Sequence, residues 1–304
     1  MKGRPQPRRL SANEDRGRAS HQPNGRSPRL NLLMSRPYIT PDVVRAMIEH
    51  QDHLNLLVDC GAVTAWNRGE TVSLDDYCRF LSALPVKPWG IIALDKMGDA
   101  EETLKNYATM KDRGFDPIPV ITRKAPREHV DYYCDRAPMV AGGGLASAKG
   151  QSPLPRAMQV MGQVAGRKPV HLLGFTSIRY IAAARPYSVD SSSWESAARY
   201  GAMDVYVGGG RMLKVTRKEM LTRPSDEVCG SIRRYGFNPL DLARDAAWRG
   251  GNSVTRGVSA SSWVNLAREM EAKIGTRLFL AAANLPAMMA CVRGHLYQTQ
   301  GREL

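Results

Sequence analysis

The chain has 304 residues, of which 43% are hydrophobic and 24% are charged, as in ordinary globular proteins. Its formal net charge of +14 indicates an acidic partner, most often nucleic acid and less often a membrane surface. The five cysteines are far apart and form no CxxC pair, which argues against a disulfide scaffold and a zinc ribbon. No run of 18 apolar residues is present and the N-terminus lacks the apolar region of a signal peptide, so we expect a cytoplasmic protein without a membrane partner.

Residues 1–30 form the first distinct segment and are rich in Arg, Pro, Ser, Asn and Gly. They contain eight Lys or Arg residues and two acidic residues, with almost nothing apolar to bury. This composition predicts a disordered basic tail. The tail is either a solvated leader or an electrostatic arm for nucleic acid.

From residue 31 onward, short apolar strands alternate with segments of helical spacing. The expected strands are LNLLM, LNLLVD, WGIIALD, DPIPVIT, PMVAGGG, VHLLGF and PYSVD. The expected helices between them include TPDVVRAMIEH, SLDDYCRFLSAL, DAEETLKNYATMKDRG and SPLPRAMQVMGQVAG, with caps or terminating glycines. This alternation predicts a parallel sheet covered by helices. The number of strands favours a (β/α)8 TIM-type barrel over an open doubly wound sheet.

The pattern changes after residue 190. The stretch AMDVYVGGGRMLKVT predicts an inserted β-hairpin with a glycine turn. The polar segment that follows predicts a short helix around 240–249, and two further helices are expected at 259–273 and 278–296. We therefore divide the chain into the tail at 1–30, a barrel core with the catalytic site at 31–225, and a helical C-terminal part at 226–304 that completes the barrel.

Two aspartates end apolar strands about 130 residues apart. Asp59 follows LNLLV and Asp190 follows PYSV, and each is followed by small residues and a tryptophan, Trp66 and Trp194. Such an aspartate is often only a helix cap. Since catalytic residues of barrels lie at the C-terminal ends of strands, the pair also fits glycosyl transfer, with one carboxylate as nucleophile and the other as general acid/base about 5 Å away.

Other candidate site residues lie near the same strand ends. Asp95 is either an acceptor for the N–H edge of a purine-like base, or a buried structural acid or cap. Gly142, Gly143 and Gly144 allow a flat ligand to approach the backbone. The predicted nucleic-acid contacts are Arg211, Lys214 and Arg217, although arginines in this region also suit a solvated surface. His50 and His53 form an HxxH pair without further metal ligands, and His171 stands alone, so no metal site is expected.

Several segments resemble a known family. VDCGAVTAW is similar to the DSGGFQ segment of tRNA-guanine transglycosylases, and closer to the DCGAFSAW pattern of phage and bacterial DNA 7-deazaguanine transglycosylases of the DpdA type. SVDSSSW resembles the second aspartate motif of these enzymes. The segments LDKMGDAEETLKNYATMKDRGFDPIPV, APMVAGGG, HLLGFTS and YGAMDVYVGGGRMLKV are also similar and occur in the same order. The resemblance covers residues 32–225.

The resemblance implies a (β/α) barrel and a base-exchange reaction that needs no cofactor. It assigns Asp190 as the nucleophile and Asp59 as the general acid/base. The base would be held by Asp95, Cys60, Gly61 and the Gly142–Gly144 backbone. Guanine would leave DNA, a nucleotide would remain on Asp190, and a free 7-deazaguanine such as the 7-cyano form would replace it. A target in duplex DNA has to be flipped out first, and a phage origin is implied.

One departure from the family concerns zinc. The tRNA enzymes carry a CxCxxC group and a later histidine, whereas this chain has only Cys229 near that position. We therefore expect no zinc. Two alternatives remain, namely the same exchange on tRNA and a non-catalytic barrel that binds nucleic acid. The sequence leaves the oligomeric state open, with a homodimer as one possibility.

Overall fold

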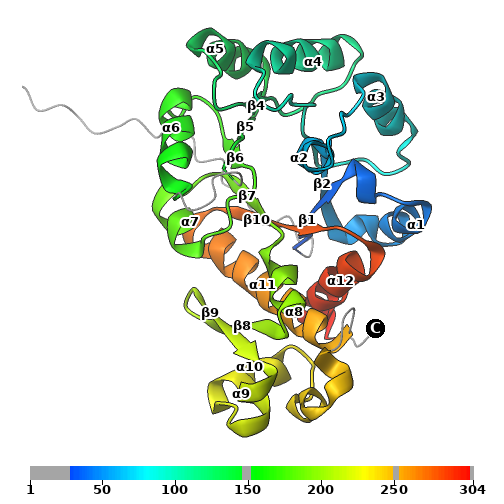
Figure 1. Cartoon of the computed structure of the whole chain (residues 1–304), viewed down its shortest axis with the longest axis vertical. Coiled ribbons are helices and arrows are strands. Elements are labelled where there is room, and N and C mark those ends of the chain that lie inside the picture. Colours follow the sequence, from blue (N-terminus) through cyan, green and yellow to red (C-terminus); the bar gives the residue numbers. More distant parts are fainter. Residues whose placement is uncertain (1–27, 146–151, 249–252, 302–304) are drawn as a thin grey trace, which may run out of the picture.

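The computed structural model describes residues 28–145, 152–248 and 253–301. Most of the predicted basic tail therefore lies outside the described residues. The main element is an eight-stranded parallel sheet in the order β3-β2-β1-β10-β7-β6-β5-β4, which curls round with helices on its outer side (Figure 1). Its strands are β1 (Leu30–Ser35), β2 (Leu54–Asp59), β3 (Gly90–Ile91), β4 (Val120–Ile121), β5 (Val140–Gly142), β6 (Val170–Leu172), β7 (Ser188–Ser191) and β10 (Arg277–Ala282).

The sheet is compatible with a TIM-like barrel, but its ladders do not close into one. The continuous pairing ends at β3 and β4, and between these two the described residues form an isolated parallel bridge from Ile92 to Ile118. Ile118 N donates to Ile91 O at 2.7 Å. Pro117 and Pro119 flank this residue and have no N–H to donate, which limits the ladder here. The predicted α/β class is confirmed, whereas the predicted closed barrel is seen only as a curled half-barrel.

The helices that follow the first strands agree with the sequence predictions. Those predicted are α1 (Pro41–His50), α3 (Leu74–Ala83), α4 (Ala100–Asp112) and α6 (Leu154–Val164). Thr40, Ser73 and Asp99 cap the first three, because each side chain accepts a hydrogen bond from a first-turn N–H. The remaining elements of this part are α2 (Ala62–Asn67), α5 (Arg127–Arg136), α7 (Ile178–Ala184), α8 (Ser193–Arg199) and the 3-10 turns η1 (Arg36–Tyr38) and η2 (Gln51–His53).

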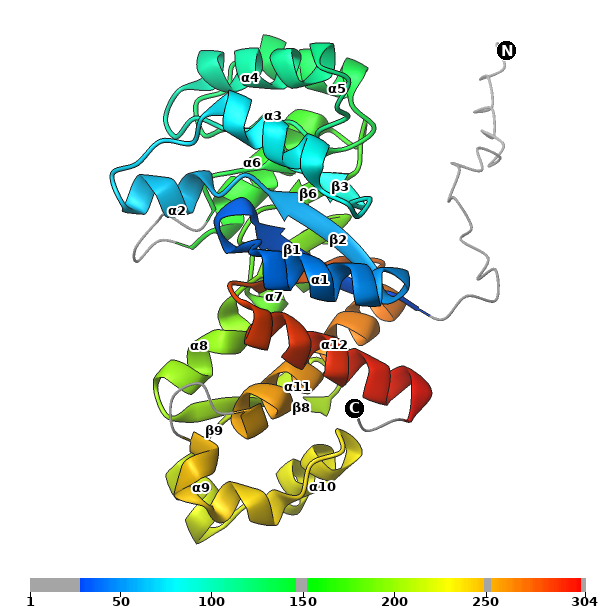
Figure 2. The same cartoon turned by 90° about the vertical axis from the view of Figure 1, so that its right-hand side faces the viewer.

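The predicted hairpin is present and belongs to a small separate unit. It consists of β8 (Ala202–Gly208) and β9 (Arg211–Thr216), and it is followed by α9 (Arg217–Thr222), α10 (Asp226–Arg234), η3 (Pro239–Ala243) and η4 (Asp245–Trp248). The helix predicted around 240–249 is wrong as a single helix, because this segment forms two short 3-10 helices, η3 and η4. The unit has its own apolar cluster, and it lies at the end of the molecule opposite α4 and α5 (Figures 1 and 2).

The helix predicted at 278–296 is also wrong in its first part. After α11 (Ser253–Ile274), residues Arg277–Ala282 form β10, and only then does α12 (Leu285–Gln300) begin. β10 pairs with β1 on one side and with β7 on the other, so it is the strand that joins the two halves of the sheet. Asn284 caps α12 by accepting from Ala287 N at 2.9 Å. Among the described residues, no helix has the length and apolar character needed to cross a membrane.

The strands bury two different faces. Alternate residues such as Leu33, Leu57, Val120 and Phe279 form one cluster, whereas the intervening residues pack with the helices in the main core. Side chains two positions further along a strand share its face. Asp59 therefore follows Leu57 on the same face, at the carboxyl end of β2.

Candidate active site

Asp59 ends β2 in a buried polar setting. Its Oδ2 accepts a hydrogen bond from Ser35 Oγ at 2.7 Å and another from Gly61 N at 3.0 Å. Burial raises the pKa of Asp59, and the charge of Asp190 raises it further. The two carboxylates predicted as a pair are thus within electrostatic range. A raised pKa keeps a proton on Asp59 more readily than on an exposed aspartate, as a general acid requires.

Cys60 and Asp95 extend this group. The Cys60 thiol lies 3.6 Å from Asp95 Oδ1 and 4.0 Å from Asp59 Oδ1, so it lies between the two acids. Burial holds the pKa of Cys60 well above its usual range, so the group is a neutral S–H donor. Burial and the charge of Asp59 raise the pKa of Asp95 to about 6. Gly61 is required by the turn, because its φ is +82° and an added Cβ would lie 2.6 Å from Pro37 Cδ.

Asp190 lies in β7, one residue before its end, and is 9% exposed. Its Oδ1 accepts from Gly174 N at 2.8 Å and lies 3.2 Å from His171 Nε2. A carboxylate can only accept, so His171 donates its Nε2–H to Asp190. His171 Nδ1 lies 2.9 Å from Ser188 Oγ, within hydrogen-bond distance. This buried chain orients the Asp190 carboxylate.

His171, Ser188 and Gly174 were not predicted as site residues. His171 and Ser188 are register partners on β6 and β7, and the ring of Phe279 packs edge-on against His171 at 5.9 Å between centroids. The alternation Ser188–Asp190 places both side chains on one face of β7. That spacing was the only available signal, because the pairing of β6 with β7 depends on a register that the sequence does not specify.

The predicted glycine segment follows β5 and has three different environments. An added Cβ on Gly142 would lie 2.9 Å from Val160 of α6, so this glycine allows close packing. Gly143 O accepts from Arg156 Nε at 3.3 Å, and Gly144 O accepts from Arg123 Nη2 at 2.8 Å. Two arginines that sequence reasoning missed therefore hold this strand end.

A cleft of about 700 Å³ opens beside the acidic group. Its walls come from α2, from the segment after β3 and from α4, and they include Trp66, Glu70, Asp95, Asp99 and Asn106. Asp59 and Asp190 are not among its lining residues. The structure thus places Asp95, but neither of the aspartates predicted to be catalytic, in the open cleft.

The two tryptophans that follow the aspartate motifs differ in environment. Trp66 is 60% exposed and lines the cleft, whereas Trp194 is fully buried and donates to Ala281 O at 2.8 Å. Trp194 is therefore a core residue that fixes α8 against β10. Within the residues that the structure describes, no three His, Cys, Asp or Glu side chains are grouped to hold a metal ion.

The three predicted nucleic-acid contacts each face an acid. Arg211 Nη2 lies 2.9 Å from Glu227 Oε2, and Lys214 Nζ lies 3.9 Å from Asp204 Oδ1. Arg217 forms an ion pair with Asp245. Their place on the hairpin and on α9 agrees with the predicted surface position, and their role in binding stays a prediction. Comparison of the chain with known protein families and with curated proteins finds no match.

Proposed function

We propose that this protein is a pentosyltransferase that exchanges guanine in DNA for a free 7-deazaguanine through a covalent aspartyl-nucleotide. The observation that carries the proposal is the contrast between two acids at strand ends. Asp190 receives two N–H donors on one oxygen, whereas Asp59 is half-buried and its burial raises its pKa. Two carboxylates in different environments are what nucleophilic and acid/base roles require.

In the first step, Asp190 is the nucleophile. The two donors hold Oδ1, so Oδ2 forms the bond to the anomeric carbon of the nucleotide. The bond from that carbon to N9 of guanine breaks, and its electron pair goes to the base. Asp59 supplies the proton that the leaving guanine takes up, and a sugar ester on Asp190 remains.

In the second step, the incoming base reverses the process. The deprotonated Asp59 removes a proton from the free 7-deazaguanine, whose ring nitrogen then bonds to the anomeric carbon. The ester C–O bond breaks and its electron pair returns to Asp190. His171 and Gly174 stabilise the departing carboxylate through the same two hydrogen bonds.

The environment of Asp95 supports a nearby base site. Asp95 combines a position in the cleft with proximity to the Cys60 thiol, which links it to Asp59. The exposed ring of Trp66 in the same cleft offers a surface for stacking a flat heterocycle. The resemblance to 7-deazaguanine transglycosylases names the base class, with the 7-cyano form as the first candidate.

The test is mass spectrometry of nucleosides from cells that express the protein and are supplied with 7-cyano-7-deazaguanine. We expect the deazaguanine deoxynucleoside in DNA with the wild type and its loss with Asp190→Asn. Modified nucleoside in tRNA alone would reassign the substrate to tRNA. Binding of DNA with no exchange, for any 7-deazaguanine supplied, would refute the enzyme and leave a nucleic-acid-binding barrel.

A further inference from the structure

A second hollow, of about 460 Å³, lies between the sheet and the hairpin unit. It is distinct from the acidic cleft and shares no lining residue with it. Its walls come from the beginning of α7, from α8, from the hairpin and from α11. They include the hydroxyl residues Ser177 and Ser193 and the cations Arg179 and Lys214.

Two serines that line the hollow are close in the chain to the proposed nucleophile and to one of its donors. Ser193 is three residues after Asp190, and Ser177 is three residues after Gly174, whose N–H holds the Asp190 carboxylate. The Ser177 side chain forms no cap bond to α7, although Ser177 occupies the N-cap position. Its hydroxyl is therefore available to a ligand. A strand that follows these two segments away from a nucleotide at Asp190 would meet the hollow.

Among the described residues, neither cation of the hollow donates a direct hydrogen bond to an acid. Arg179 is exposed, and its described contacts are the hydroxyl of Tyr180 at 3.4 Å and the ring of the same residue. Lys214 lies 3.9 Å from Asp204, too far for a direct hydrogen bond. The Asp204 carboxylate is itself engaged by Trp263 Nε1 at 2.9 Å. The hollow therefore presents two cations and one buried, hydrogen-bonded acid.

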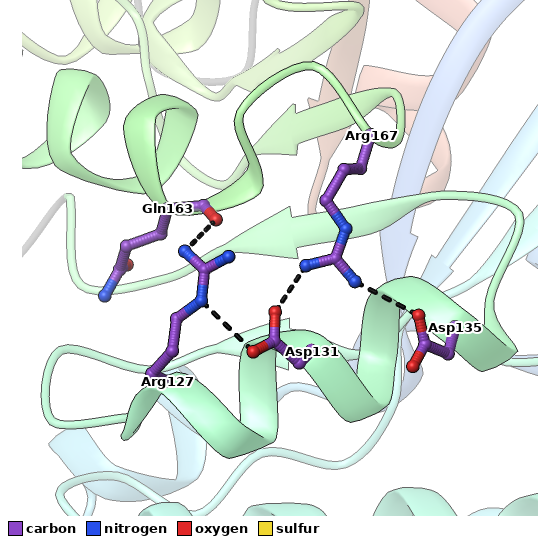
Figure 3. Close-up of polar contacts among 5 residues, drawn as sticks. All are labelled: Arg127, Asp131, Asp135, Gln163 and Arg167. Atoms are coloured by element: carbon purple, nitrogen blue, oxygen red, sulfur yellow. Dashed lines mark hydrogen bonds and ion pairs between the residues drawn. The ribbon is translucent and has the colours of Figure 1, made fainter.

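Basic and acidic residues are distributed unevenly along the chain, and the segment that contains Arg179 is basic. Residues 31–116 contain nine Lys or Arg against thirteen Asp or Glu, whereas residues 117–200 contain eleven against five. Part of the second group is paired on the outer helices, where Arg127 and Arg167 share Asp131, and Arg167 also binds Asp135 (Figure 3). Arg179 belongs to this basic stretch but faces the hollow, so it is better placed to meet an external anion.

We propose that this hollow binds a phosphodiester group of the DNA strand, next to the nucleotide that reacts at Asp190. The inference rests on the proposed function, because Asp190 defines where the strand is held. Arg179 and Lys214 supply the charge, and the Ser177 and Ser193 hydroxyls supply neutral donors. The acidic cleft on the other side is left to the free base, so the two substrates approach from different sides.

The experiment measures binding of a fluorescein-labelled DNA duplex by anisotropy, with the full chain, at 50 to 300 mM KCl. Each phosphate contact contributes about one unit to the slope of log K against log salt. We expect Arg179→Gln and Lys214→Gln each to lower the slope by about one and to weaken binding roughly fivefold at 0.15 M salt. In the Arg179→Gln/Lys214→Gln double variant, the slope should be lower by about two. Arg127→Gln, with the same charge change in a paired outer position, should leave the slope unchanged.

An unchanged slope in the double variant, with a thermal unfolding curve like that of the wild type, would overturn the proposal. An equal decrease of the slope in Arg127→Gln would also overturn the proposal, because the effect would then come from the net charge of the protein. If the variants lowered the slope for an RNA hairpin but not for DNA, the strand bound in the hollow would not be DNA. Asp190→Asn separates the two proposals, since it should abolish exchange and keep the slope. Absence of exchange in the wild type, together with the expected slopes, would refute the enzyme while keeping the hollow as a DNA contact.

Discussion

Replacing Asp95 by Asn should stabilise the protein at high pH more than at low pH. Burial is the main cause that raises the pKa of Asp95 from the ordinary 3.8 to about 6, and the charge of Asp59 adds to it. The folded state therefore binds more protons than the unfolded state between these two values. Stability must fall as the pH rises through this window, and above about pH 6 the full cost of the buried charge is present.

The size of the effect follows from the two pKa values. A rise from 3.8 to about 6 corresponds to about 3 kcal/mol of destabilisation when Asp95 is ionised. Between pH 4.5 and pH 8, about 2 kcal/mol of this cost develops, because at pH 4.5 the unfolded side chain is already largely ionised. Asn has nearly the same shape and does not titrate. The difference in free energy of unfolding between Asp95→Asn and wild type should change by about that amount over this range.

The assay is urea unfolding of both proteins at pH 4.5, 6 and 8, followed by tryptophan fluorescence. A matched control is Asp116→Asn, since Asp116 is an exposed acid that pairs with Lys111 at 2.7 Å on the surface. This control should show a change of less than about 1 kcal/mol between the same pH values. If the stability of Asp95→Asn relative to wild type were the same at pH 4.5 and pH 8, Asp95 would not be a buried acid of raised pKa.

Three further predictions follow from the site geometry. Gly61→Ala should cost at least about 1 kcal/mol in thermal unfolding, because the backbone has a positive φ and the new Cβ would meet Pro37; no loss would mean that the turn can move. His171→Leu removes one of two donors to Asp190, worth about 1.5 to 3 kcal/mol, so return of the carboxylate should slow at least tenfold. A DNA–protein adduct should then accumulate on a denaturing gel, and its absence at wild-type exchange rates would argue against the role. Arg156→Met should lower the urea midpoint by the equivalent of about 1 to 3 kcal/mol, because buried carbonyls lose their donor.

Much of the sheet was predictable because parallel strands buried on both faces are continuous apolar runs. Seven expected strands occur in order, and the alternation with helices predicted their direction. The eighth strand, β10, was missed because the run from Leu278 to Ala282 has no period of its own. A buried strand and a buried helix cannot be told apart by such a run. Gly275 before it and the Asn284 cap after it were the local signals for a separate element.

The site was predictable as a set of strand ends but not as a network. Asp59, Asp95 and Asp190 were found because each ends an apolar strand. His171 was not, because its contact with Asp190 depends on the pairing of β6 with β7. Arg156 lies in a helix more than thirty residues after Ile121, whose carbonyl it binds, and only the closure of the fold brings them together.

The helix-cap interpretation fits the two aspartates differently, because Asp59 Oδ2 does accept from Gly61 N at the start of α2. After Asp190, it is the next residue, Ser191, that accepts from the first N–H of α8, because Ser193 N donates to Ser191 Oγ at 3.1 Å. The Asp190 carboxylate instead contacts His171 on the adjacent strand β6 and Gly174 in the turn after it. Holding such a turn does not require an acid, because serine does it without the cost of burying a charge. The Asp190 carboxylate is thus not used as a helix cap, and the proposed nucleophilic role does not compete with one.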